Sequence, residues 1–227
     1  MEKKSADFAA RRSLLTGMGV AAAGVVAGAG TANAQQGGFQ PMRHDSDAWM
    51  DELPGGHRVW IDTSYGLGGM EALHYANNIL TAHGRVDGGE DSDYAMVICW
   101  RHFATPLGYK DPAWEKYGDI FSNVMGIKDP ATGETWKINP ALIQGRMELD
   151  NGGDDIGKMV GRGVQFALCN AATRWYAGYI AGETDGDAGE IYDMFVEQAI
   201  PNSRFIDAGV FGTTRAQEYG YSLLYAG

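Results

Sequence analysis

The chain has 227 residues, of which 44% are hydrophobic, with 18 Lys and Arg against 29 Asp and Glu. This length is sufficient for one domain with a well-buried core. The formal net charge of −11 repels phosphate backbones and anionic lipid, so we expect neither a nucleic-acid partner nor membrane binding by the mature protein. An acidic surface also serves solubility alone.

Residues 1–34 match an export signal. Arg11-Arg12 is followed by an uncharged run rich in Ala, Gly and Val, which ends in the small-x-small site Ala32-Asn33-Ala34. The pattern predicts twin-arginine export in folded form, cleavage after Ala34, and a periplasmic protein whose first partner is the export machinery. The alternative is an uncleaved anchor, although a spanning helix needs about 20 strongly apolar residues. The chain beyond the leader carries 14 basic and 27 acidic residues.

Beyond the leader, residues 35–57 are polar and Gly-rich, which predicts an arm or linker. Alternating apolar runs and helical patterns then predict an α/β domain over residues 58–227. The expected strands are 59–62, 94–100, 164–168, 204–207 and 221–224. The expected helices are 70–83, with Gly84 as its C-cap, 155–162, 171–180, 187–199 and 213–219. Strands separated by helices indicate a mostly parallel sheet that is covered on both faces.

Residues 103–153 are less regular, with four of the seven prolines and a turn signal at 129–133. They predict a long insertion after the second strand, with short helical pieces such as 112–117. Such a segment is typically functional or builds an oligomer interface. Its apolar side chains favour a partner surface, or else they fold back on their own domain; they are Trp114, Phe121, Ile127, Trp136 and Ile138.

Ligands of open α/β sheets bind at the carboxyl ends of the strands, which selects residues 62–69, 100–105, 169–173 and 207–213. Cys169 is the sharpest candidate because it ends an expected strand and opens an expected helix. Backbone N–H groups at a helix N-terminus favour a thiolate. The alternative is a small buried filler, since free cysteines are commonly buried.

Arg101 and His102 follow the second expected strand. Either side chain could hold an anion or a ligand near Cys169, and histidine is suited to proton transfer near neutral pH. The alternatives are an ion pair for Arg101 and a capping or packing role for His102. The tryptophans that could line an aromatic pocket, or fill the core, are Trp100, Trp114 and Trp175.

Several cofactor motifs are missing from the sequence. It contains no C-x-x-C, C-x-x-C-H or H-E-x-x-H, so attached haem and a zincin site are not supported. Residues 66–69 lack the complete G-x-G-x-x-G and a P-loop Lys, which argues against a nucleotide site. The other histidines show no spacing that demands a metal, and the cofactor stays unknown; they are His44, His57, His74 and His83.

Three segments carry a family resemblance. They are residues 163–170 (GVQFALCN), residues 205–210 (FIDAGV) with 216–221 (AQEYGY), and residues 101–106 (RHFATP) with 114–117 (WEKY). The first two resemble the cysteine strand and the C-terminal end of DsrE-like proteins, the DsrE/DsrF-like sulfur-relay superfamily. The third resembles an exported subgroup. The resemblance covers residues 58–224 apart from much of 118–153.

This resemblance implies a three-layer αβα fold of flavodoxin-like winding and a homo-oligomer, a trimer or a hexamer. It implies that Cys169 carries persulfide, with Arg101 or His102 assisting. The substrate-binding residues taken from the same motifs are Asn170, Gly209 and Gln217. The chain departs from the sulfur-relay members in its export signal and in the 103–153 segment.

Two functions stay open. One is thiol chemistry in sulfur metabolism, with sulfurtransferase-like activity at Cys169. The other is non-enzymatic binding of a small ligand or cofactor in the strand-end cleft. A redox cycle usually needs a resolving thiol, which this chain lacks near Cys169, whereas a persulfide carrier needs none.

The two cysteines, Cys99 and Cys169, are not expected to pair. The flavodoxin-like strand order 2-1-3-4-5 places one strand between them, which separates them by about 9–10 Å. A disulfide requires Cα atoms within about 7 Å.

Overall fold

Five parallel strands form the sheet of this protein in a computed structural model that describes residues 40–142 and 155–227. The strand order is β4-β3-β2-β1-β5. The strands are β1 (His57–Thr63), β2 (Tyr94–Trp100), β3 (Gln165–Cys169), β4 (Ser203–Ile206) and β5 (Ser222–Ala226). The central strands β2 and β3 read as almost continuous apolar runs because both of their faces are covered.

Helices cover both faces of the sheet. They are α2 (Trp49–Glu52), α3 (Gly66–Asp87), α4 (Asp111–Met125), α5 (Ile156–Gly161), α6 (Asn170–Thr184), α7 (Ala188–Glu197) and α8 (Gly209–Glu218). Short 3₁₀ helices cover Asp45–Asp47, Asp91–Asp93, His102–Gly108 and Pro140–Leu142. None of the helices in the described ranges is long and apolar enough to cross a membrane.

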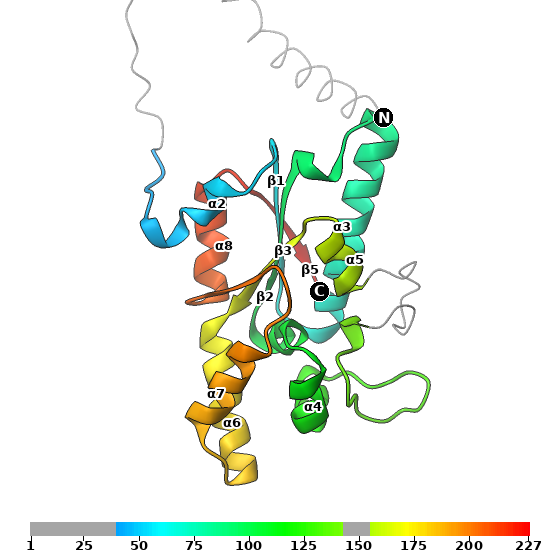
Figure 1. Cartoon of the computed structure of the whole chain (residues 1–227), viewed down its shortest axis with the longest axis vertical. Helices are drawn as coiled ribbons and strands as arrows, with labels where there is room; N and C mark the ends of the chain where they lie inside the picture. The colour runs from blue at the N-terminus through cyan, green and yellow to red at the C-terminus, as the bar shows by residue number, and fades with distance from the viewer. Residues whose placement is uncertain (1–39, 143–154) are drawn as a thin grey trace, which may run out of the picture. The chain divides into compact units, whose positions relative to one another are not determined.

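The handedness of the crossovers explains how the helices divide between the faces. From β1 to β4 each new strand is added on the same side, so right-handed crossovers bring α3 to α7 onto one face. The step from β4 back to β5 reverses direction and brings α8 onto the other face, where α2 joins it (Figure 1). The larger apolar core lies under α3 to α7, and the smaller one lies under α2 and α8. The expected three-layer αβα fold with a parallel sheet is confirmed.

The expected strand order 2-1-3-4-5 is wrong, because β2 pairs directly with both β1 and β3. Cys99 lies opposite Ala167, and Cys169 follows two residues along the same face of β3. One strand spacing combined with two residues along the strand separates the two Cα atoms by about 8 Å. This exceeds the disulfide limit of about 7 Å, and both cysteines are free thiols. The expectation of no disulfide was correct, but its reason, a strand lying between the two cysteines, was wrong.

The long segment after β2 is more regular than its proline content indicated. A 15-residue helix, α4, stands where only residues 112–117 were expected to be helical. Most of the apolar side chains expected to need a partner surface are buried against their own domain instead; the buried ones are Trp114, Phe121, Ile127 and Trp136. Residues 143–153 of this segment lie outside the described residues.

Helix α3, the first helix expected from the sequence, is longer than its pattern predicted. It begins at Gly66 rather than at residue 70, and Gly84 lies inside it rather than capping it. The C-cap is Gly88, whose φ of +68° is the left-handed conformation that glycine adopts most easily.

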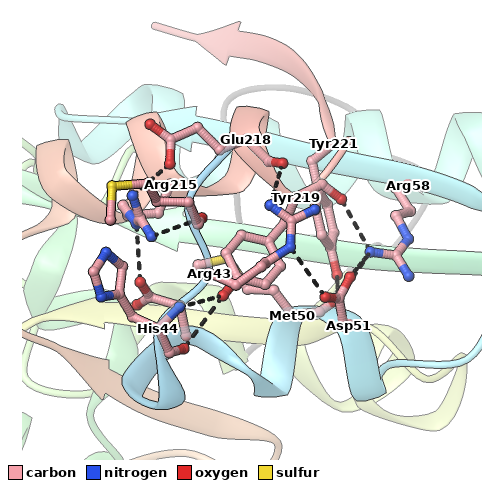
Figure 2. Close-up of polar contacts among 11 residues, drawn as sticks. Arg43, His44, Met50, Asp51, Arg58, Arg215, Glu218, Tyr219 and Tyr221 are labelled. Atoms are coloured by element: carbon pink, nitrogen blue, oxygen red, sulfur yellow. Dashed lines mark hydrogen bonds and ion pairs between the residues drawn. The ribbon is translucent and has the colours of Figure 1, made fainter. Parts of the chain in front are cut away.

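Residues 41–53, which we call the arm, pack onto the domain rather than acting as a linker (Figure 2). The Arg43 guanidinium lies 4.0 Å from the ring centroid of Tyr219. The Tyr221 hydroxyl donates to the carbonyl oxygen of Met50 at 2.8 Å. The arm thus closes the smaller core, whereas the expected signal, residues 1–34, lies outside the described residues.

An ion pair fixes the arm to α8. The Arg215 Nε donates to the Asp47 carboxylate at 2.9 Å, and the side chains of both residues are about nine-tenths buried. This carboxylate raises the pKa of Arg215. Because a buried charge is costly without its partner, the pair ties the position of the arm to that of α8.

A second charged cluster lies at the amino end of β2. The two ring nitrogens of His83 lie 3.0 Å from the Asp93 carboxylate and 3.1 Å from the Asp87 carboxylate. The hydrogen bond to Asp93 is the main cause that raises the pKa of His83, and the hydrogen bond to Asp87 adds to it. The same contact lowers the pKa of Asp93. His83 thereby joins the end of α3 to the turn before β2.

Candidate functional site

The crossovers leave a crevice at the carboxyl ends of β3 and β4. The chain leaves β3 into α6 on one face of the sheet and leaves β4 into α8 on the other face. Neighbouring strands whose connections diverge in this way form a topological switch point, where open α/β sheets bind ligands. The described structure has a cavity of about 430 Å³ at this place.

Three segments line the cavity, and each follows a different strand. Residues 101–103 come after β2, the start of α6 supplies Cys169, Ala171, Ala172 and Trp175, and residues 208–210 come after β4. Three of the four segments selected by the strand-end rule therefore meet at one site. The fourth segment, residues 62–69, does not line the cavity, but its Asp62 contacts Arg101 of the cavity wall.

Cys169 lies at the floor of the cavity and is 6% exposed. Its Sγ accepts hydrogen bonds from the backbone N–H of Gly209 at 3.2 Å and of Ala172 at 3.4 Å. These donors belong to the first turns of two helices, α8 and α6. Two backbone N–H groups therefore point at the Cys169 sulfur from two different helices.

Arg101 reaches the site from β2 and is held by Asp62. Its Nε and Nη2 donate to the two carboxylate oxygens at 2.9 and 2.8 Å. This contact raises the pKa of Arg101. Thr213 of α8 also donates to Asp62, at 3.1 Å. The buried carboxylate thus neutralises the guanidinium and fixes its place in the cavity wall.

Gly209 is required by the close approach of α8 to Arg101. A Cβ at this position would lie 2.3 Å from the Cβ of Arg101. The Gly209 N–H is also one of the two donors to the Cys169 sulfur. Gly209 was expected to bind substrate, and it does line the cavity. It also lets α8 pack closely against the Arg101 side chain.

His102 lies at the mouth of the cavity with a φ of +53°. A residue other than glycine pays of order 1 kcal/mol or more for this left-handed conformation. Its ring contacts Phe103, with 3.9 Å between ring centroids. The strained backbone turns the imidazole onto the rim rather than into the core, since His102 is exposed.

An aromatic wall completes the site, and the sequence indicated only part of it. Trp175 is 49% exposed, stacks on Tyr179 with 5.3 Å between centroids, and lies 6.4 Å from Phe103. The other two candidate tryptophans, Trp100 and Trp114, are fully buried in the core. Tyr179 and Phe103 could have been found from their place one helical turn beyond Trp175 and one residue after His102.

Two expected substrate-binding residues do not line the cavity. The Asn170 side chain accepts a hydrogen bond from the Tyr192 hydroxyl at 2.9 Å. Gln217 donates to the Thr213 carbonyl within α8 at 3.2 Å. Both amides therefore make contacts within the protein that hold α6 to α7 and stabilise α8.

The second cysteine, Cys99, lies beneath α8 and is fully buried. Burial, followed by the charge of Asp62, raises its pKa well above the ordinary value. Within residues 40–142 and 155–227, no three His, Cys, Asp or Glu side chains form a group that could hold a metal ion.

Comparisons with known proteins add no functional assignment. No family model and no curated protein matches the chain. Among solved structures, the chain is similar to the protein of unknown function MTH1491 from Methanobacterium thermoautotrophicum. That match has 12% identity and a TM-score of 0.38, and it covers 74% of this chain and 98% of the other.

Proposed function

We propose that this chain is an exported DsrE-like protein that carries sulfur as a persulfide on Cys169. The observation that supports this most is the Cys169 sulfur itself, which lines a cavity at the switch point and accepts N–H groups from two helices. The cavity beside Cys169 also offers room for the outer sulfur of a persulfide, which carries the negative charge.

The loading step is a thiolate displacement on a sulfane sulfur. The Cys169 thiolate attacks the terminal sulfur of an inorganic polysulfide and forms a new S–S bond. The neighbouring S–S bond of the polysulfide breaks, and the shortened polysulfide leaves with the electron pair. The thiol proton is lost beforehand to solvent or to the imidazole of His102 at the cavity mouth. Transfer to an acceptor thiolate reverses the sequence, so no external oxidant is consumed.

The proposal includes a setting for this carrier. The twin-arginine leader indicates the periplasm, and the family resemblance indicates a trimer or hexamer in sulfur metabolism. A carrier of this kind needs no resolving thiol, in keeping with a Cys99 that is fully buried.

Mass spectrometry after treatment with inorganic polysulfide tests the proposal. We expect the wild-type protein and Cys99→Ser to gain one sulfur atom, ~32 Da, which a reductant removes. Cys169→Ser should gain none. An adduct that persists in Cys169→Ser, or that never forms on wild type, contradicts the carrier function.

The second candidate is a binding protein for a small apolar ligand. It is favoured by the half-exposed Trp175 and by the alanines that also line the cavity, Ala171, Ala172 and Ala208. We expect the fluorescent probe 8-anilinonaphthalene-1-sulfonate to bind wild type and Cys169→Ala equally and Trp175→Ala at least tenfold more weakly. Equal binding by all three proteins contradicts this candidate.

A further inference from the structure

The strand β5 forms a free edge of the sheet. It pairs with β1 on one side, and no strand of the described residues pairs with its other side. Its central side chains are exposed although all are large and apolar or aromatic: Leu223 is 41% exposed, Leu224 39% and Tyr225 49%. A strand in this position offers unpaired backbone N–H and C=O groups to another strand.

None of the usual devices that protect a free edge is present in β5. The strand Ser222–Ala226 contains no charged residue and no proline. Its register with β1 is one to one throughout, so it has no bulge. The opposite edge of the sheet differs, because β4 is shorter and carries Arg204, whose guanidinium lies 4.7 Å from the ring centroid of Trp49. The β5 edge therefore carries fewer features that oppose pairing than the β4 edge does.

We propose that β5 pairs with β5 of a second copy of this chain, antiparallel and about a two-fold axis at Leu224. Two-fold symmetry makes two identical strands antiparallel. The axis places Leu224 opposite its own counterpart on one face, and Leu223 opposite Tyr225 of the second copy on the other face. Aliphatic and aromatic pairs of this kind are the favourable cross-strand contacts.

The strand's own sequence argues for a second copy as the occupant. Each exposed apolar side chain in this register meets another one, and no charge is opposed by a like charge. A partner strand with acidic side chains would bring charge against Leu223 and Leu224, and desolvating that charge is costly. The pairing joins two five-stranded sheets into one of ten strands.

The interface lies apart from the cavity, so it does not depend on the proposed function. The cavity is formed by the segments after β2, β3 and β4, whereas β5 lies beyond β1. Both copies keep their cavities open. A hexamer built from three such dimers contains this contact, and a simple three-fold ring does not.

Crosslinking at the axis tests the register. Directly opposite residues of antiparallel strands have Cα atoms about 4.5–5.5 Å apart, within the range of a disulfide. In a Cys99→Ser, Cys169→Ser background, Leu224→Cys should form a covalent dimer on mild oxidation. The control is Val86→Cys, on an apolar position of α3 that is 72% exposed and therefore more accessible than Leu224, and it should stay uncrosslinked.

Sedimentation velocity tests the association itself. We expect wild type and Val86→Lys to form dimers or hexamers at micromolar concentration, and Leu224→Lys to dissociate at least tenfold more readily. A wild-type monomer overturns the proposal. So does a Leu224→Cys protein that crosslinks no faster than the control.

Discussion

Replacing Gly209 with alanine tests the packing on which the site depends. The added Cβ would lie 2.3 Å from the Cβ of Arg101, and 3.0 Å from its Cδ. Carbon atoms in favourable contact lie about 3.5–4.0 Å apart, so the helix α8 or the Arg101 side chain has to move by about 1 Å. Either movement loosens the ion pair between Arg101 and Asp62, whose oxygens accept at 2.8 and 2.9 Å.

The expected cost is that of overpacking a close-packed interior, about 1–3 kcal/mol. For a unit of this size, 1 kcal/mol shifts the melting temperature by about 2–4 °C. Gly209→Ala should therefore melt about 2–12 °C below wild type. The Gly209 N–H also moves away from the Cys169 sulfur, so iodoacetamide should modify Cys169 faster in the variant.

Gly178 supplies a control of opposite sign. It lies in the exposed face of α6, and a Cβ there would meet nothing within 4 Å. Gly178→Ala should stabilise the protein by about 0.5–1 kcal/mol, because alanine loses less backbone entropy in a helix. Thermal unfolding followed by circular dichroism measures both variants. The reasoning is refuted if Gly178→Ala behaves as expected while Gly209→Ala melts at or above the wild-type temperature.

Four further predictions concern the thiols, two core groups and export. Iodoacetamide near pH 7 should modify Cys169 before Cys99, since burial hides Cys99 and raises its pKa; peptide mapping that shows equal rates would contradict this. The pKa of His83 is raised, so its stabilisation is complete below about pH 6.5 and is lost as pH rises through the folded value. His83→Gln should therefore lower the unfolding free energy in urea more at pH 5.5 than at pH 9, and a pH-independent loss would argue against the ion pairs. Tyr176→Phe should raise stability by about 1 kcal/mol, because the Tyr176 hydroxyl is buried and has no hydrogen-bond partner in the described residues; destabilisation in urea would reveal a partner. Lysines at residues 11–12 should retain the protein in the cytoplasm, and an unchanged periplasmic yield would disprove the signal.

The strands were predictable from the sequence because a strand buried on both faces leaves a distinctive pattern. Residues 94–100 are a continuous apolar run, and β2 has these bounds. Most of helix α4 was not predicted, because Pro112 and the neighbouring prolines were interpreted as signals for turns and helix ends. Pro112 in fact stands in the first turn, where proline is tolerated because its missing N–H needs no partner.

The order of the strands was not predictable from hydrophobic periodicity. An apolar strand fits equally well beside any other apolar strand, so the pattern of β1 and β2 is the same in either order. The decisive difference is the distribution of helices: among the described residues, α2 and α8 cover one face and α3 to α7 cover the other. That distribution follows from which crossover reverses direction, and no local run of residues records it.

The site residues were predictable in part, because the carboxyl ends of parallel strands lie at the same edge of the sheet in any strand order, although the order decides which of them meet. Cys169, Arg101, His102 and Gly209 meet at one cavity for this reason. The ion pair that holds Arg101 was not predicted, although a signal was present: Asp62 is a lone charge at the end of a buried apolar strand. A charge in such a place is rarely found without a partner.

The corrected strand order changes which segments line the cavity. In the order 2-1-3-4-5, the switch point lies between the first and third strands, and residues 62–69 would line the crevice. In the observed order the crossovers diverge between β3 and β4, so the crevice opens beside Cys169. Residues 62–69 do not line the cavity, and Asp62 is linked to it through the contacts with Arg101 and Thr213. The cysteine thus occupies the position where a sheet of this winding exposes a side chain to a ligand, which a small filler residue would not require.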